Sequence, residues 1–363
     1  MVCVGSGPPT ATDEWFSGFP EEDRDNNMDW HAANKVFPCT GIPRIHFDGK
    51  PPGAERAERI FIADTTFRDG QQARAPYNLE QIGAIFDLLH RLSGPQGIIR
   101  QTEFFVYTKR DRLALEFCMA KGYLYPVPTG WIRASHQDLG LLSEVGLQRT
   151  AILTSVSDYQ IFLKLKANRK TALDMYLSVV RSALDKGIVP TCSFEDITRS
   201  DVYGFCVPFA LELMRLREES RVDISIRLCD TLGLGVPYPG SALPRSVPGI
   251  ARALIDDAGV PGRLLQWHGH NDFHKALVNA VTAWLHGCAG ASGTLFGLGE
   301  RTGNTPIEAL VMEYIGIKGT AEGMDTTAIA DMARYFEEEL GYDFPAHYPL
   351  VGRNSACAIR MAG

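Results

Sequence analysis

Strand-like and helix-like segments alternate eight times between residues 59 and 318. The strand-like segments are short apolar runs, and most precede a segment whose apolar positions recur with the spacing of an amphipathic helix. Eight alternations over roughly 260 residues match the size of a (β/α)8 barrel. The sequence therefore predicts an α/β fold of the TIM-barrel type. The predicted strands are residues 60–63, 98–106, 127–133, 148–153, 188–194, 223–229, 264–267 and 292–296.

Helices are predicted after most of these strands. Asn78 is the expected N-cap of the first helix. A long helical stretch is expected from Leu163 to Ala183. Residues 305–308, with the sequence T-P-I-E, are expected to open the last barrel helix with an N-cap, a proline at the first helical position and a capping glutamate. The other predicted helices are residues 110–121, 207–216, 247–255 and 276–285.

Two segments flank the predicted barrel. Residues 1–58 are rich in Pro, Gly, Asp and Asn, and they contain the large aromatic residues Trp15, Phe16, Trp30 and Phe37. A disordered tail is one interpretation, but the aromatic residues favour an irregular extension that packs on its own or a neighbouring subunit. Residues 319–363 are expected to form a short helical segment. The expected domains are residues 1–58, 59–318 and 319–363.

Composition excludes several classes of partner. The net charge of −7 and the absence of a long basic run argue against nucleic acid and anionic membrane surfaces. We find no run of about 18 apolar residues and no leader-like start, so neither a membrane span nor a secretion signal is expected. The eight cysteines contain no C-x-x-C pair, which indicates reduced thiols and a cytoplasmic location.

His268 and His270 stand where a predicted strand ends. Because side chains two residues apart on a strand point to the same side, their imidazoles are expected to converge. Two neutral imidazoles suit a divalent cation such as Zn²⁺, Mn²⁺, Fe²⁺ or Co²⁺. Asp64, at the end of the first strand, is the predicted carboxylate ligand. Arg68 is expected beside it, facing a substrate carboxylate or a developing oxyanion.

Further polar residues follow other strands, and a closed barrel brings all strand ends to one face. Glu195 is a candidate general base, although a salt-bridged strand end is the simpler interpretation. Thr231 is either part of a helix-entry turn or a donor to a substrate carboxylate. The loop 297–304 lacks the spacing of a dinucleotide-binding loop, and we interpret it as a turn that brings Asn304 to the metal.

Five ordered motifs carry a family resemblance. They are D-T-T-F-R-D-G-Q-Q at 64–72, F-E-D at 194–196, L-C-D-T-L-G at 228–233, H-G-H-N-D at 268–272 and G-E-R-T-G-N at 299–304. Over about residues 59–340 the chain resembles the DRE-TIM metallolyases, a family of isopropylmalate, homocitrate and citramalate synthases, Re-citrate synthase and hydroxymethylglutaryl-CoA lyase. The resemblance implies a divalent metal, Mn²⁺ first and Mg²⁺, Co²⁺ or Zn²⁺ otherwise. It implies Asp64, His268, His270 and Asn304 as ligands, Arg68, Gln72 and Thr231 around a 2-keto acid, and Glu195 in proton transfer.

Within that family, residues 71–77, 128–133, 154–159 and 238–247 resemble the Re-citrate synthase branch most. This implies an acyltransferase that condenses acetyl-CoA with oxaloacetate, with Arg133 as our choice for the second carboxylate of the keto acid. Isopropylmalate, homocitrate and citramalate synthesis stay open. The lyase branch is disfavoured, because its cysteine-bearing loop is here Glu300–Arg301–Thr302. The resemblance also implies a homodimer.

One departure concerns the C-terminus. The family's condensing enzymes continue with a G-I-H-type segment, whereas residues 355–363 contain no histidine. The expected alternatives are therefore a truncated or catalytically impaired member, or a barrel kept for assembly or regulation. An iron oxygenase with two histidines and one carboxylate is a rival from another class. The barrel alternation and Asn304 speak against it.

Overall fold

The computed structural model describes residues 58–355. The rest of the predicted N-terminal extension, residues 1–57, and residues 356–363 lie outside the described residues, and the predicted domain boundaries stay predictions.

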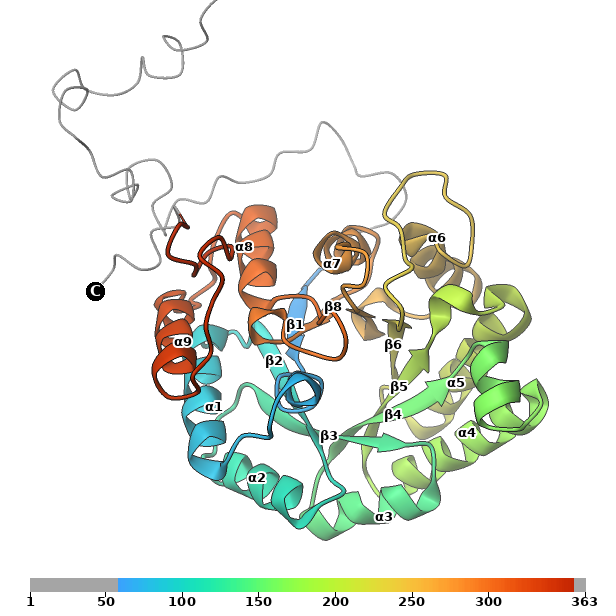
Figure 1. Ribbon diagram of the computed structural model, residues 1–363. Coiled ribbons are helices and arrows are strands. Elements are labelled where there is room, and N and C mark those ends of the chain that lie inside the picture. Colours follow the sequence, from blue (N-terminus) through green and yellow to red (C-terminus); the bar gives the residue numbers. More distant parts are fainter. Residues whose placement is uncertain (1–57, 356–363) are drawn as a thin grey trace, which may run out of the picture.

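Eight parallel strands close into a barrel in the order β1 to β8, and helices surround it (Figure 1). The (β/α)8 prediction is confirmed. Closure occurs through β8, which pairs Gly293 with Asp64 of β1 and Ser292 with His268 of β7. The strands are β1 Phe61–Asp64, β2 Ile99–Phe105, β3 Val127–Arg133, β4 Arg149–Ser155, β5 Val189–Glu195, β6 Ser225–Asp230, β7 Leu265–Gly269 and β8 Gly290–Gly293.

The helices cover the outside of the barrel with apolar faces. In α1, Ile82, Ile85, Phe86 and Leu89 recur with helical spacing and are buried. Asn78 caps α1 as predicted, in a capping box with Gln81. The helices are α1 Leu79–Ser93, α2 Lys109–Ala120, α3 His136–Val145, α4 Arg169–Asp185, α5 Val207–Ser220, α6 Val247–Arg252, α7 Ala276–Leu285, α8 Ile307–Lys318 and α9 Thr327–Glu338.

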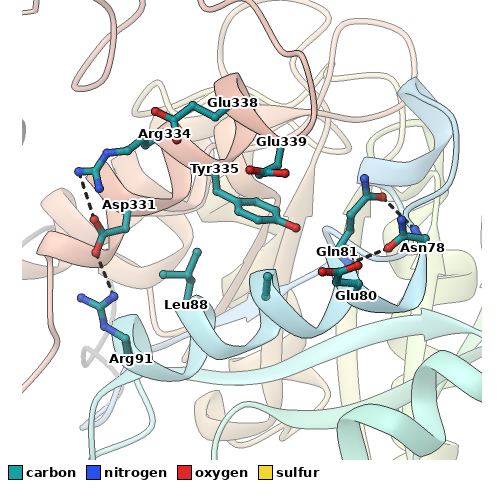
Figure 2. Close-up of a pocket in the computed structure, with 11 residues that line it drawn as sticks. Asn78, Glu80, Gln81, Leu88, Arg91, Asp331, Arg334, Tyr335, Glu338 and Glu339 are labelled. Atoms are coloured by element: carbon teal, nitrogen blue, oxygen red, sulfur yellow. Dashed lines mark hydrogen bonds and ion pairs between the residues drawn. The ribbon is translucent and has the colours of Figure 1, made fainter.

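Helix α9 follows the barrel and packs beside α1 (Figure 1). Figure 2 shows the groove between these two helices. Arg91 of α1 pairs there with Asp331 of α9 at 2.9 Å, and Tyr335 of α9 lies between the two ends of the groove. The predicted helical segment after the barrel is therefore present in residues 327–338.

Three local predictions need correction, and one helix was missed. The predicted strand 292–296 is instead Gly290–Gly293, and it cannot extend to Phe296, which adopts a left-handed conformation (φ 56°). Helix α3 was not predicted. The predicted helical stretch from Leu163 is not continuous. Leu163 belongs to a π-helical turn, Tyr159–Lys164, and α4 begins separately after its N-cap Asn168. Finally, α8 has no side-chain cap, and Glu308 bonds elsewhere.

Among the described residues, no helix combines the length and apolar character that a bilayer crossing requires. The five cysteines in the described part of the chain are all buried and free.

Candidate metal centre

Two buried histidines lie at the C-terminal end of β7, on the barrel face where the strands end. The exposed fractions of His268 and His270 are 4% and 7%, and their ring centroids are 5.3 Å apart with nearly perpendicular planes. Burial, and then His270, lower the pKa of His268 well below its ordinary value. Burial also lowers the pKa of His270, despite the nearby Asp69 carboxylate. Both imidazoles are therefore neutral near pH 7 and retain a lone pair for a cation.

The carboxylate beside these histidines is Asp69. Its Oδ2 atom lies 3.3 Å from Nε2 of His268 and 3.2 Å from the side-chain nitrogen of Asn304. The chain reaches this point because the residues after β1 make a tight turn, in which the amide of Arg68 donates to the carbonyl of Thr65. Asp69 thus belongs to the same strand end as Asp64, one turn further along.

Asp64, the carboxylate that the sequence predicts as a ligand, has other hydrogen-bond partners. One oxygen accepts from the amide and the hydroxyl of Thr66, at 2.9 and 2.5 Å, and the other accepts from the hydroxyl of Thr102. Burial raises the pKa of Asp64 to about 6, despite these hydrogen bonds. In the described residues, none of its hydrogen bonds goes to a histidine. Asp64 therefore fixes the turn that carries Asp69.

Asn304 reaches the cluster from the loop between β8 and α8, as the sequence predicts. Its backbone amide donates to the carbonyl of Gly297 at 2.9 Å, and its backbone pairs with that of His270. The side chain passes so close to Gly299 that a Cβ atom there would lie 1.8 Å from Oδ1 of Asn304. Gly299 is therefore required by the approach of this amide.

The donor set fits a divalent cation. Within the described residues, no three His, Cys, Asp or Glu side chains already surround a common point at ligand distances. However, Nδ1 of both histidines and Oδ1 of Asn304 are buried without a hydrogen-bond partner. Unpaired buried polar atoms are costly, and a ligand to them removes that cost. Two neutral imidazoles, a carboxylate and an amide oxygen are donors that Mn²⁺, Co²⁺ and Zn²⁺ accept.

Arg68 belongs to a buried ionic chain. Its guanidinium contacts Asp69 at 2.5 Å and Glu103 at 2.5 Å, and Glu103 also accepts from Arg227 at 2.7 Å. Burial lowers the pKa of Arg68, but Asp69 and Glu103 more than offset it, so the pKa lies above its ordinary value. A buried, positively charged guanidinium thus stands beside the cluster.

Sequence reasoning missed three of these residues. Asp69 directly follows Arg68 in the same segment as Asp64, and only the geometry of the turn distinguishes the two carboxylates. Glu103 and Arg227 are charged residues in the middle of strands β2 and β6, and both are fully buried. A charge in such a strand requires a partner across the barrel interior, and that was the available signal.

Glu195 and Thr231 stand at the ends of β5 and β6, as predicted. Glu195 accepts a hydrogen bond from the hydroxyl of Ser155 and lies 3.3 Å from Nζ of Lys164. Thr231 accepts from the amide of Asp196 at 2.8 Å.

Gln72 and Arg133 are less closely associated with the cluster. Gln72 is exposed and makes no side-chain hydrogen bond within the described residues. The side chain of Arg133 is 65% exposed and binds Asp138 through two nitrogens, at 2.8 and 3.0 Å. Two of its donors are therefore engaged before any substrate arrives.

Residues 59–335 match the family model described as HMGL-like. The chain belongs to the HMGL-like family. This HMGL-like chain is 61% identical over 322 residues to the citrate (Re)-synthase of Syntrophus aciditrophicus, covering 89% of the chain and 51% of that relative. It is 50% identical over 328 residues to the citrate (Re)-synthase of Clostridium kluyveri, covering 90% of the chain and 72% of that relative. It thus spans about half the length of the first relative and most of the second.

A further relative has another printed activity. The 2-phosphinomethylmalate synthase of Streptomyces hygroscopicus is 35% identical over 328 residues, covering 88% of this chain and 74% of that one. Among solved structures, the Bacillus subtilis HMG-CoA lyase superposes with a TM-score of 0.60 at 21% identity, covering 80% of this chain and 97% of the lyase. That likeness concerns the fold alone.

Proposed function

We propose that this chain condenses acetyl-CoA with oxaloacetate and hydrolyses the resulting thioester, giving citrate and free CoA with Re stereochemistry. The observation that carries this proposal is the identity of 61% and 50% to two proteins named citrate (Re)-synthase, over about nine tenths of the chain. The polar cluster at the strand ends supports it, since it offers donors for a cation and a fixed guanidinium.

Asp69, His268, His270 and Asn304 are the residues that would hold the divalent cation, with Mn²⁺ first and Mg²⁺, Co²⁺ or Zn²⁺ otherwise. Asp69 takes the place that the sequence assigned to Asp64. When bound, such a cation supplies Lewis-acid polarisation of a keto carbonyl.

The protein's own residues supply the remaining chemistry. Glu195 takes a proton from the methyl group of acetyl-CoA, and the methyl carbon then forms a bond to the keto carbon of oxaloacetate. Arg68 faces the carbonyl oxygen, which becomes an alkoxide and gains a proton. Thr231 and Gln72 hold carboxylate oxygens of the keto acid. Water then cleaves the thioester and releases CoA.

The second carboxylate of oxaloacetate needs a second cation. Arg133 remains the proposed residue, and it would exchange one contact to Asp138 for the substrate. A homodimer in the cytoplasm completes the proposal; the buried free thiols support a reducing compartment.

A free-CoA release assay with acetyl-CoA and a panel of 2-keto acids tests the substrate. Oxaloacetate is expected to give the highest kcat/KM. To test the stereochemistry, citrate is made from labelled acetyl-CoA, isolated, and cleaved by a citrate lyase of ordinary Si specificity. The label is expected in the oxaloacetate product of this cleavage. Label in the acetyl fragment would contradict the Re assignment.

A different keto acid is the second candidate, because relatives at 30% and 27% identity carry the names 2-isopropylmalate synthase and homocitrate synthase. Preference for 2-oxoisovalerate or 2-oxoglutarate in the same panel would favour them. Cation binding without CoA release from any keto acid would favour an assembly or regulatory role.

A further inference from the structure

One buried carboxylate connects two segments that are distant in sequence. Glu308, in the first turn of α8, is 2% exposed. Its Oε2 atom accepts from the backbone amide of Phe296 at 3.0 Å, and its Oε1 atom accepts from the hydroxyl of Tyr348 at 3.0 Å. Phe296 belongs to the β8–α8 loop, residues 294–306, and Tyr348 belongs to the C-terminal segment, residues 342–352. Glu308 thus bonds both.

On the loop side, the bond leads directly to the candidate metal centre. The backbone amide that donates to Glu308 belongs to Phe296, the residue before Gly297. The carbonyl of Gly297 accepts a hydrogen bond from the backbone amide of Asn304 at 2.9 Å. The side chain of Asn304 then contacts Asp69 at 3.2 Å. A displacement of Phe296 would therefore move the acceptor that fixes Asn304.

The loop needs this support because Phe296 is left-handed (φ 56°), a conformation that is unfavourable for a bulky side chain. Its ring is held by the C-terminal segment, with centroid distances of 4.7 Å to Phe344 and 6.4 Å to Tyr348. The C-terminal segment is itself held in place, because the amide of Gly352 donates to the carbonyl of Tyr348 and the side chain of Val351 is fully buried.

Burial disfavours the charged carboxylate of Glu308 and therefore raises its pKa to about 7. An apolar residue of similar size would avoid that cost, but it would leave the amide of Phe296 and the hydroxyl of Tyr348 without their acceptor. The carboxylate therefore joins two segments at an energetic cost.

We propose that Glu308 is a positioning residue that couples the C-terminal segment to the loop carrying Asn304, so that a change at Tyr348 is felt at the candidate metal centre. The link to catalysis rests on the proposed function, whereas the mechanical coupling does not. The C-terminal segment, which lies outside the barrel, thereby controls how rigidly Asn304 is held at the candidate metal centre.

Hydrogen exchange of the metal-free, full-length chain tests the coupling directly. Tyr348→Phe removes one hydroxyl, and it is expected to speed exchange at the amides of Phe296 and Asn304 at least several-fold. Tyr203→Phe is the matched control, because the Tyr203 hydroxyl donates to a carboxylate of Asp257 at 2.9 Å, outside both segments. It is expected to leave both amides unchanged.

Calorimetric titration with Mn²⁺ gives the second readout. Tyr348→Phe is expected to weaken Mn²⁺ binding about tenfold, the range seen when outer partners of a metal site are changed. A melting temperature lowered without faster exchange at Asn304 and without weaker Mn²⁺ binding would mean a merely structural role, and would overturn the proposal. If wild-type protein binds none of Mn²⁺, Mg²⁺, Co²⁺ and Zn²⁺, the proposed function fails while the exchange result still decides the coupling.

Glu308 variants complete the test. Glu308→Gln keeps an acceptor for Phe296 and is expected to retain most of the loop protection. Glu308→Leu keeps no acceptor, and it is expected to speed exchange at the amides of Phe296 and Asn304 more than Tyr348→Phe does. Equal exchange in the Gln and Leu variants would contradict the proposal; if the Leu variant does not fold, Tyr348→Phe decides alone.

Discussion

Oδ2 of Asp69 lies 3.3 Å from Nε2 of His268, and this approach joins the loop after β1 to the end of β7. Asp64 stands five residues earlier, with both carboxylate oxygens bonded to threonines. The two carboxylates therefore have separable roles, which substitution can distinguish.

Asp69→Asn is expected to weaken Mn²⁺ binding by more than about 100-fold, since even outer partners of a metal site contribute 10–100-fold. Asp64→Asn is the matched control. It is expected to lower the melting temperature, because it disturbs buried hydrogen bonds to Thr66 and Thr102, and to change Mn²⁺ affinity only a few-fold. Calorimetric titration measures both. A larger affinity loss in Asp64→Asn than in Asp69→Asn would show that Asp64 is the ligand.

Glu308 is expected to make the stability of the protein depend on pH. Its pKa is about 7 in the folded chain and ordinarily 4.5, so between these values the folded state binds the proton more tightly. The carboxyl's contribution to the free energy of unfolding is fully present below about pH 4.5 and is lost as the pH rises through 7. Relative to Glu308→Gln, wild type is expected to lose about 3 kcal/mol between these limits.

Urea unfolding of both proteins across that pH range measures this loss. The groups that face Glu308 are Tyr348 and Tyr342, which stay protonated there. A stability difference between the two proteins that does not change with pH would refute the assignment.

Glu195→Gln is expected to lower kcat by about 10²- to 10⁴-fold with little change in either KM, as for loss of a general base. Ser155→Ala removes only the hydroxyl that donates to Glu195. It is expected to lower kcat much less, because the carboxylate remains. Steady-state kinetics decides; unchanged kcat in Glu195→Gln would remove Glu195 from the chemistry.

Arg133→Ala is expected to raise KM for oxaloacetate far more than KM for acetyl-CoA. Asp138→Asn is the companion variant, since it releases the Arg133 guanidinium from its present partner. It is expected to lower KM for oxaloacetate. Equal effects of Arg133→Ala on both KM values would exclude Arg133 from recognition of the second carboxylate.

The sequence predicted the barrel because strand-like and helix-like runs leave clear periodicities. It also placed His268, His270 and Asn304 correctly at one face, since all parallel strands end there. The predicted C-terminal end of β8 was wrong because of Phe296. An aromatic residue favours a strand, but in the folded protein Phe296 packs on Phe344 and adopts a left-handed conformation.

The position of Asp69 beside the histidines depends on a turn that periodicity does not describe. Both carboxylates follow β1, and only the hydrogen bonds from Thr66 and Thr102 show that Asp64 is occupied. Similarly, the pairing of Glu103 with Arg68 and Arg227 joins three strand regions, and no local pattern predicts which charges meet inside a barrel.

Free-CoA release from acetyl-CoA and oxaloacetate, before and after chelation, tests the central claim most directly. Metal-stripped wild-type protein is expected to release no CoA, added Mn²⁺ is expected to restore the rate, and Asp69→Asn is expected to stay inactive with Mn²⁺ present. CoA release at the same rate after chelation, or full activity of Asp69→Asn, would contradict a cation-dependent condensation at this centre.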